Sequence, residues 1–254
     1  MLAVNDLAVR FGGVTALESV SFQVRPGSIT SVIGPNGAGK TTAFNAITGY
    51  LRPTGGRITY DGTALTGLRP SVIAQRGIVR TFQKTSVFPA LSVEDNVLTG
   101  LHLRGTAGFF AILAGRRRLS AEERSLAAEA AQIIEFVGLA HRRREAASAL
   151  PYGEQRLVEL AVALAARPRV LLLDEPGAGM TGSEKAVVSG LIRRVREQGV
   201  TVLLVEHDMR MVMGISDTVI VLNGGRVIAE GAPAAIQTHP EVIRAYLGAA
   251  AGSA

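Results

Sequence analysis

The stretch ITSVIGPNGAGKTTAFNAI, residues 29–47, combines a strand pattern, a glycine-rich loop and a helix pattern. Its first five residues read as a buried strand that runs directly into a glycine loop, and Phe44, Ile47 and Leu51 then follow at helical spacing. Between them, GPNGAGKTT at 34–42 fits the phosphate-loop pattern GxxxxGK[ST] in the context that its mechanism requires. The order of strand, glycine loop and helix therefore predicts a phosphate-binding α/β unit.

Each residue type in this loop suits an anionic ligand. The glycines let backbone N–H groups close on phosphate oxygens, and the start of the helix adds its positive dipole end. Lys40, one of three lysines in the chain, would neutralise the terminal phosphates, and Thr41 offers a hydroxyl to Mg²⁺. An ordinary glycine turn is the alternative. We expect ATP contacts from Gly34, Pro35, Asn36, Gly37, Ala38, Gly39, Lys40, Thr41 and Thr42.

Further polar positions follow two other apolar runs. Asp174 and Glu175 come after 170–173, and His207 comes after 200–205. Because ligands bind at the carboxyl edge of a parallel sheet, we expect these side chains near the phosphate loop. Asp174 would hold the Mg²⁺ shell, Glu175 would orient and deprotonate the attacking water, and His207 would hydrogen-bond the γ-phosphate. Helix capping is the alternative for the two carboxylates.

Gln83 ends the expected strand 78–82, where its amide oxygen would suit Mg²⁺ or the attacking water. Taken alone, this position is ambiguous. Together these groups suit phosphoryl transfer to water, which requires positioning and charge stabilisation. The expected catalytic residues are Glu175, His207, Gln83 and Lys40, and the expected metal ligands are Thr41, Gln83 and Asp174.

Composition and charge limit the other classes of function. No run approaches the roughly 20 consecutive apolar residues of a membrane span, and the N-terminus does not have the pattern of a secretory signal. The formal charge of +6 is spread along the chain, with short arginine clusters only at 116–118 and 142–144, so no nucleic-acid partner is expected. The absence of cysteine excludes disulfides and agrees with a reducing compartment.

A helical block interrupts the predicted α/β core. The patterns predict one domain, with the core and an antiparallel β part over 1–95 and 156–230. Asn223-Gly224-Gly225 predicts a hairpin near the end of this core. A helical subdomain is expected over 96–155, and a C-terminal helix over 231–254.

The segment LPYGEQRLVELA at 150–161 resembles the signature motif of ABC ATPases. GPNGAGKTT, RTFQ at 80–83, LLLDEP at 171–176 and VEHDM at 205–209 stand in that family's order, so the resemblance covers almost the whole chain. It implies an α/β phosphate-loop NTPase core with a parallel sheet, an antiparallel β subdomain and an inserted α-helical subdomain. It also implies hydrolysis of ATP with Mg²⁺.

In that family, the signature loop of one subunit completes the ATP site of another. The resemblance therefore implies a second ATPase subunit, either a paralogue or a second copy. Tyr152, Gly153 and Glu154 would contact the partner's ATP, and Phe11 matches the aromatic residue that stacks on adenine. An ordinary core position is the alternative for Phe11.

Two positions depart from the family pattern. Pro151 stands where a serine is usual and offers neither a hydroxyl nor an N–H to a phosphate, so we expect Gly153 to contribute more there. Thr181 stands where the loop after the Asp-Glu pair usually has Asp or Asn. We expect it to be a weak substitute in the hydrogen bond across the dimer.

Finer similarity points to one subgroup. The opening VNDLAVRFGGVTALESVSFQV, the YGEQR segment, the insert at 109–124 and the tail HPEVIRAYLG are similar to ATPase subunits of branched-chain amino acid importers. That resemblance implies integral membrane permease subunits, contacted by about 84–96, and indirectly a periplasmic or extracellular substrate-binding protein. It also implies a peripheral position on the cytoplasmic face of the inner (plasma) membrane.

Three alternatives to amino-acid import stay open. A urea importer and a lipopolysaccharide exporter use similar ATPases. A soluble ABC protein that acts on ribosomes or DNA is disfavoured, because such proteins usually have tandem ATPase domains or a long coiled-coil insertion, and neither pattern occurs in the sequence.

Overall fold

The computed structural model describes residues 1–81, 87–102 and 121–251. Gln83 and most of the insert at 109–124 lie outside the described residues, so their expected roles stay predictions. Among the residues that are described, no helix has the length and apolar character needed to cross a bilayer.

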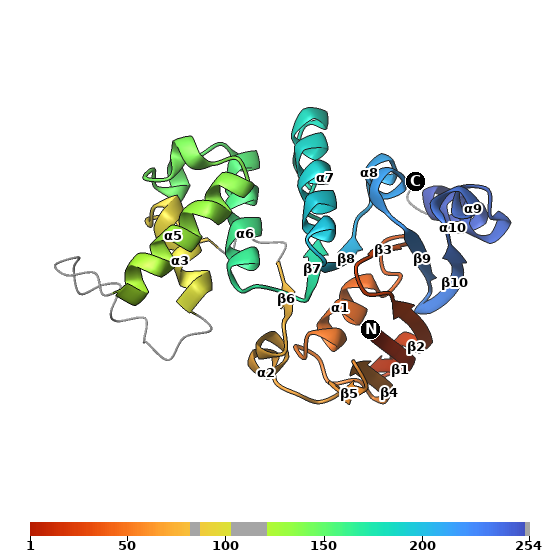
Figure 1. The fold of residues 1–254 in the computed structure, drawn as a ribbon. Helices are drawn as coiled ribbons and strands as arrows, with labels where there is room; N and C mark the ends of the chain where they lie inside the picture. The colour runs from red at the N-terminus through yellow and green to blue at the C-terminus, as the bar shows by residue number, and fades with distance from the viewer. Residues whose placement is uncertain (82–86, 103–120, 252–254) are drawn as a thin grey trace. The chain divides into compact units, whose positions relative to one another are not determined.

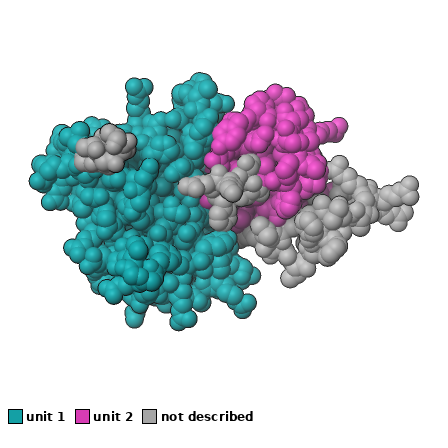
Figure 2. Space-filling model, turned by 180° about the vertical axis from the view of Figure 1, so that it is seen from behind, with its two compact units in different colours: residues 1–80, 169–254 teal, residues 81–168 magenta. Residues whose placement is uncertain are grey.

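The described chain divides into two compact units (Figure 2). The first unit contains 1–80 and 169–254, and the second contains 81–168. The second unit therefore covers a longer range of residues than the helical subdomain expected over 96–155.

The first unit is built on a six-stranded sheet in the order β10-β9-β3-β8-β7-β6 (Figure 1). Its strands are β3 (Ile29–Ile33), β6 (Ile78–Arg80), β7 (Val170–Asp174), β8 (Thr201–Val205), β9 (Thr218–Asn223) and β10 (Arg226–Gly231). The strands from β9 to β6 in this order pair in parallel, whereas β10 pairs antiparallel to β9. β3, β7 and β8 are buried at every residue, which explains the apolar runs of β7 and β8.

The register of this sheet brings the strand ends together. Val205 pairs with Asp174 on β7 and with Val32 on β3. Because these strands are parallel, the loops that leave β3, β7 and β8 start from the same edge. The predicted site residues that follow these strands therefore share that edge.

A four-stranded antiparallel sheet in the order β2-β1-β4-β5 completes the β structure of this unit. Its strands are β1 (Leu2–Phe11), β2 (Val14–Val24), β4 (Gly55–Tyr60) and β5 (Thr63–Ala64). Helix α1 (Lys40–Ile47) buries Phe44 and Ile47 in a core shared by both sheets. The predicted α/β class with its antiparallel β part is confirmed. Leu51 lies beyond the end of α1, yet it still packs against this core.

Five further helices belong to the described residues of this unit. They are α2 (Pro70–Gln75), α7 (Gly182–Glu197), α8 (Met209–Ile215), α9 (Pro233–Gln237) and α10 (Pro240–Ala251). The single C-terminal helix expected from the sequence is divided into α9 and α10. Pro240 begins α10, because proline is tolerated in the first turn of a helix but lacks the N–H that would continue α9.

The second unit is helical in its described residues. It contains α3 (Val93–His102), α5 (Ala121–Phe136), α6 (Tyr152–Ala165) and the short 3₁₀ helices η1 (Ala140–Arg142) and η2 (Ala147–Ala149). α6 belongs to this unit because α3 packs closely against it. A Cβ on Gly100 would lie 2.5 Å from the carbonyl oxygen of Val162, so glycine permits this approach.

Candidate functional site

The glycine loop between β3 and α1 has a backbone that only glycine adopts readily. Gly34, Gly37 and Gly39 have φ angles of 149°, 79° and 102°. A Cβ on Gly34 would lie 2.0 Å from the carbonyl oxygen of Leu222, and one on Gly39 would lie 2.8 Å from that of Ala16. The loop therefore packs against β9 and β2 too closely to accept side chains at these two positions.

The Lys40 side chain folds back over this loop. Its Nζ donates hydrogen bonds to the carbonyl oxygens of Gly34 and Pro35, at 2.7 Å and 2.9 Å. Burial lowers the pKa of Lys40, although the nearby charges of Glu175 and Asp174 oppose this shift. A phosphate at the loop would favour the charged ammonium and so counteract the effect of burial.

Asp174 ends β7 and is almost fully buried. Its Oδ2 lies 2.6 Å from Nη2 of Arg80, the last residue of β6. Arg80 Nη1 also donates to Asn45 Oδ1 on α1 at 2.6 Å, and its guanidinium carbon lies 5.6 Å from the ring centre of Phe44. Arg80 therefore connects the Asp174 strand to the helix that begins at the phosphate loop.

Glu175 has a left-handed backbone, with a φ of 49°. Its N–H donates to the carbonyl oxygen of Val205 at 2.9 Å, which holds the chain in this conformation. Its Oε1 lies 3.9 Å from Nδ1 of His207, whose side chain is 63% exposed. The structure thus brings together the two side chains expected to act on the attacking water and the γ-phosphate.

Glu206, one residue before His207, was given no role by the sequence analysis. Its side chain is buried, and its two oxygens accept hydrogen bonds from different loops. Oε1 accepts from the N–H of Gly177 at 2.7 Å. Oε2 accepts from the N–H groups of His207 and Asp208, at 3.0 Å and 3.3 Å. An acidic residue next to His207 was the only signal in the sequence, because burial is not visible there.

Arg80 was also given no role in the sequence analysis. The available signal was a cation at the end of the strand that neighbours Asp174. Its partner could be recognised only after the parallel pairing of β6 and β7 was known, since Arg80 and Asp174 are far apart in the chain.

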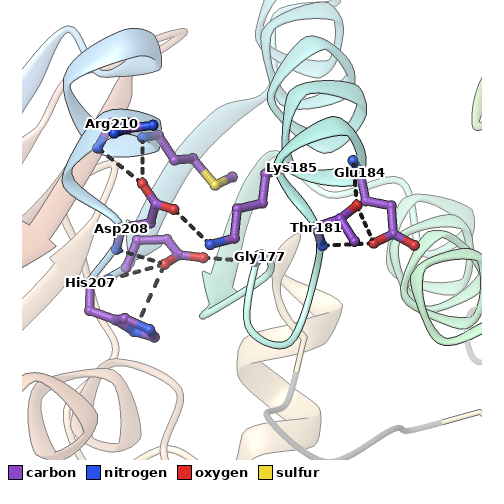
Figure 3. Close-up of polar contacts among 9 residues, drawn as sticks. Gly177, Thr181, Glu184, Lys185, His207, Asp208 and Arg210 are labelled. Atoms are coloured by element: carbon purple, nitrogen blue, oxygen red, sulfur yellow. Dashed lines mark hydrogen bonds and ion pairs between the residues drawn. The ribbon is translucent and has the colours of Figure 1, made fainter.

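Thr181 caps the N-terminus of α7 (Figure 3). Its hydroxyl and its N–H both donate to Glu184 Oε2, at 2.7 Å and 2.8 Å, and the hydroxyl accepts from the N–H of Glu184. These hydrogen bonds from Thr181 lower the pKa of Glu184. The Thr181 side chain is therefore engaged within its own chain.

Phe11 ends β1, and 52% of its surface is exposed. It therefore does not occupy the core. Thr41 is exposed on the first turn of α1, directly after Lys40, so its hydroxyl is accessible.

The signature segment lies in the second unit. Pro151 is the N-cap of α6 and makes no side-chain capping hydrogen bond. Tyr152 is 45% exposed and Gly153 is buried. Glu154 Oε2 accepts from Arg142 Nε at 3.1 Å, so its carboxylate is held within this unit.

Comparison with known proteins agrees with this geometry. Residues 17–178 match the family model described as ABC transporter, and 226–252 match the model described as branched-chain amino acid ATP-binding cassette transporter. The first match contains the phosphate loop, the signature segment and the Asp-Glu pair. The second contains β10, α9 and all of α10.

Individual relatives match almost the whole chain. A Pseudomonas aeruginosa protein named high-affinity branched-chain amino acid transport ATP-binding protein BraF is 43% identical, with 98% of each chain covered. The Escherichia coli protein of the same description, LivG, is 42% identical with the same coverage. The solved ADP conformation of an ATP-binding cassette of an ABC transporter superposes with a TM-score of 0.86 and 31% identity, covering 98% of each chain. The chain therefore belongs to the ABC transporter family, as an ATP-binding cassette that hydrolyses ATP.

Proposed function

We propose that this chain energises the import of branched-chain amino acids, or of related amino acids or amides, as one subunit of a membrane complex. The main support for this proposal is the near-complete match to relatives named for high-affinity branched-chain amino acid transport. The separate match at 226–252 to a branched-chain family model supports the same subgroup.

The phosphates of ATP would bind at the glycine loop. The backbone N–H groups of the loop and the N-terminus of α1 favour negative charge. Lys40 already donates to two loop carbonyls, and we propose that it turns its ammonium to the terminal phosphates when ATP binds. Phe11, exposed at the end of β1, would stack on the adenine.

The donor set at this edge fits Mg²⁺, which prefers oxygen ligands and is commonly shared with substrate phosphates. Thr41 would contribute its exposed hydroxyl, and Asp174 would act from the end of β7. When bound, the ion would neutralise charge that develops on the phosphates. Gln83 is proposed as a further ligand on the strength of its motif alone.

Glu175 and His207 would act on the reaction itself. The Glu175 carboxylate would orient and deprotonate the attacking water, and the exposed His207 imidazole would hydrogen-bond the γ-phosphate. Their separation of 3.9 Å supports a shared site, because a water and a phosphate oxygen lie next to each other in an in-line attack.

A second cassette, either a paralogue or another copy, would complete the site. Its Tyr152, Gly153 and Glu154 would face the γ-phosphate across the dimer. The uncapped start of α6 supports this role, since a helix N-terminus favours an anion. ATP binding would then close the dimer, and hydrolysis would open it.

Membrane permease subunits are the proposed recipients of this motion, through about 84–96, of which the structure describes 87–96. Asn96 is fully buried and fixes this segment, with its amide donating to the carbonyl oxygens of Phe88, Leu91 and Ser92. The Phe88 side chain is 47% exposed on the segment. A peripheral position on the cytoplasmic face of the membrane follows, and a substrate-binding protein would act indirectly from the other side.

The experiment is an uptake assay with the chain, its paired ATPase and its permeases in sealed vesicles. We expect ATP-dependent accumulation of leucine, isoleucine or valine, or of a related amino acid or amide, and none with Glu175→Gln. Urea uptake alone, or stimulation of the ATPase only by lipopolysaccharide, would contradict the proposed cargo.

A further inference from the structure

Two loops that leave the carboxyl edge of the sheet share one buried acceptor, the Glu206 carboxylate. One oxygen binds the N–H of Gly177, two residues after Glu175. The other binds the N–H groups of His207 and Asp208. Since the side chain is only 1% exposed, it is shielded from solvent and held by backbone donors of its own chain.

A second link joins the helices that follow these loops (Figure 3). Lys185, in the first turns of α7, places its Nζ 2.7 Å from Asp208 Oδ2. The other oxygen of Asp208 caps α8 by accepting from the N–H groups of Arg210 and Met211, at 3.0 Å and 3.1 Å. The start of α8 is therefore tied both to α7 and to the Gly177 loop.

The Gly177 backbone packs closely against the Glu206 carboxylate. A Cβ on Gly177 would lie 2.9 Å from Glu206 Oε1 and 3.2 Å from the Met211 sulfur. The backbone of the loop therefore lies directly against the acceptor. From this point the chain continues through Gly179 to Thr181, the position expected to face the other cassette.

We propose that Glu206 is a positioning residue that makes the Glu175–Thr181 loop and the His207 loop move as one body. This inference rests on the proposed roles of Glu175 and His207. When His207 meets the γ-phosphate, the Glu206 carboxylate transmits that position to the loop that carries Glu175. The two groups then reach the water and the phosphate together. A displacement of about 1 Å at such a site can cost roughly 100-fold in rate.

The chemistry of the carboxylate gives a specific test. A glutamine at this position has one acceptor oxygen, and its NH₂ group would face an N–H donor on the other side. The side chain of Glu206→Gln can therefore accept hydrogen bonds from the N–H groups of one loop but not of both. We expect kcat of the assembled ATPase to fall roughly 10- to 100-fold, while KM for ATP changes by less than about threefold.

Asp217→Asn is the matched control. Asp217 Oδ2 accepts from the N–H of Ile29 at 2.8 Å, so this change also replaces a carboxylate that accepts from the backbone with an amide. It lies at the amino end of β3, away from the catalytic edge. At a temperature where circular dichroism shows every variant folded, the control should keep kcat within about twofold of the parent.

Gly177→Ala perturbs the contact between the Gly177 backbone and Glu206 Oε1 while it keeps the carboxylate. If Glu206→Gln does not fold, Gly177→Ala tests the positioning role in its place. Its new methyl group would press on Glu206 Oε1, so kcat should again fall with little change in KM. A normal kcat in folded Glu206→Gln would overturn the inference, and so would a change confined to KM. If Glu206→Gln does not fold, the same outcomes in Gly177→Ala would overturn it. The ATPase activity of Glu175→Gln is measured in the same assay. If Glu175→Gln hydrolyses ATP at the parental rate, the proposed role of Glu175 fails. If Glu175→Gln is inactive while Glu206→Gln has the parental rate, only the positioning role of Glu206 is refuted.

Discussion

At the scale of single residues, Glu175 combines a proposed catalytic side chain with an unfavourable backbone. A non-glycine residue in the left-handed region costs roughly 1–3 kcal/mol and persists only where its surroundings fix it. Here the surroundings include the hydrogen bond from its N–H to Val205 and the buried strand that precedes it. The conformation turns the chain away from β7 directly after Asp174, and so leaves the Glu175 carboxylate near His207.

A glycine at this position should relieve the backbone strain. We expect Glu175→Gly to be more stable than Glu175→Ala by about 1 kcal/mol, because glycine adopts a positive φ without the Cβ penalty. The measurement is urea denaturation of both variants, and both should lack ATPase activity. Equal stability of the pair would show that the backbone at Glu175 carries no strain.

At the scale of elements, the capping residue of α8 also carries an ion pair between helices. Lys185 lowers the pKa of Asp208, and the N–H groups of Met211 and Arg210 add to this shift. A carboxyl whose pKa is lower in the folded state stabilises the fold above its unfolded pKa of about 3.9. That stability is lost as the pH falls through the folded pKa.

Asp208→Asn should isolate this contribution, because asparagine also caps helices while it cannot form the ion pair. The parent should be more stable than the variant above about pH 5, and the difference should shrink as the pH falls below about 4. Denaturant unfolding at several pH values measures this difference in stability. A substitution of an exposed residue, Glu197→Gln, is the control, and its stability difference from the parent should stay small. A difference that stays constant over this range would rule out the Lys185–Asp208 pair as its source.

The strand, glycine loop and helix around Lys40 were predictable from the sequence, because the loop has a fixed spacing and buried strands are rich in apolar residues. The strand ends at Asp174 and His207 were predictable for the same reason. The division between α9 and α10 was missed, although the polar residues 237–239 and then Pro240 mark it in the sequence.

The supporting residues of the site could not be predicted in this way. Arg80 and Glu206 act through groups that become neighbours only when the sheet forms. Their roles depend on burial and on pairing between distant strands, and neither property is a local pattern. The role proposed for Gln83 comes from its place after an expected strand, and the role of the signature segment 152–154 comes from family resemblance. Both stay predictions.

At the scale of the whole molecule, the glycine loop belongs to the first unit and the signature segment to the second. We expect that a complete ATP site draws on both segments, with the signature segment supplied by another cassette. Pro151 is the position where this chain departs from the family at that contact. As the N-cap of α6 it contributes no side-chain hydrogen bond.

Pro151→Ser should therefore tighten ATP-driven dimerisation. The serine adds a hydroxyl for a phosphate or for the start of α6, and one hydrogen bond of about 1 kcal/mol corresponds to roughly fivefold in the dissociation constant. Pro151→Ala is the matched control, because it removes the proline without adding a hydroxyl. Analytical ultracentrifugation with ATP, in the Glu175→Gln background, measures the change. If the serine and alanine variants dimerise equally, the missing hydroxyl does not limit closure.

We expect the glycine loop to hold ATP while Glu175 drives its hydrolysis. Single-turnover hydrolysis of ATP by the Glu175→Gln cassette, compared with the parent, separates these two roles. We predict that the variant binds ATP as the parent does, hydrolyses it roughly 10²- to 10⁴-fold more slowly, and accumulates as an ATP-bound dimer. Turnover at the parental rate would show that Glu175 is not the general base.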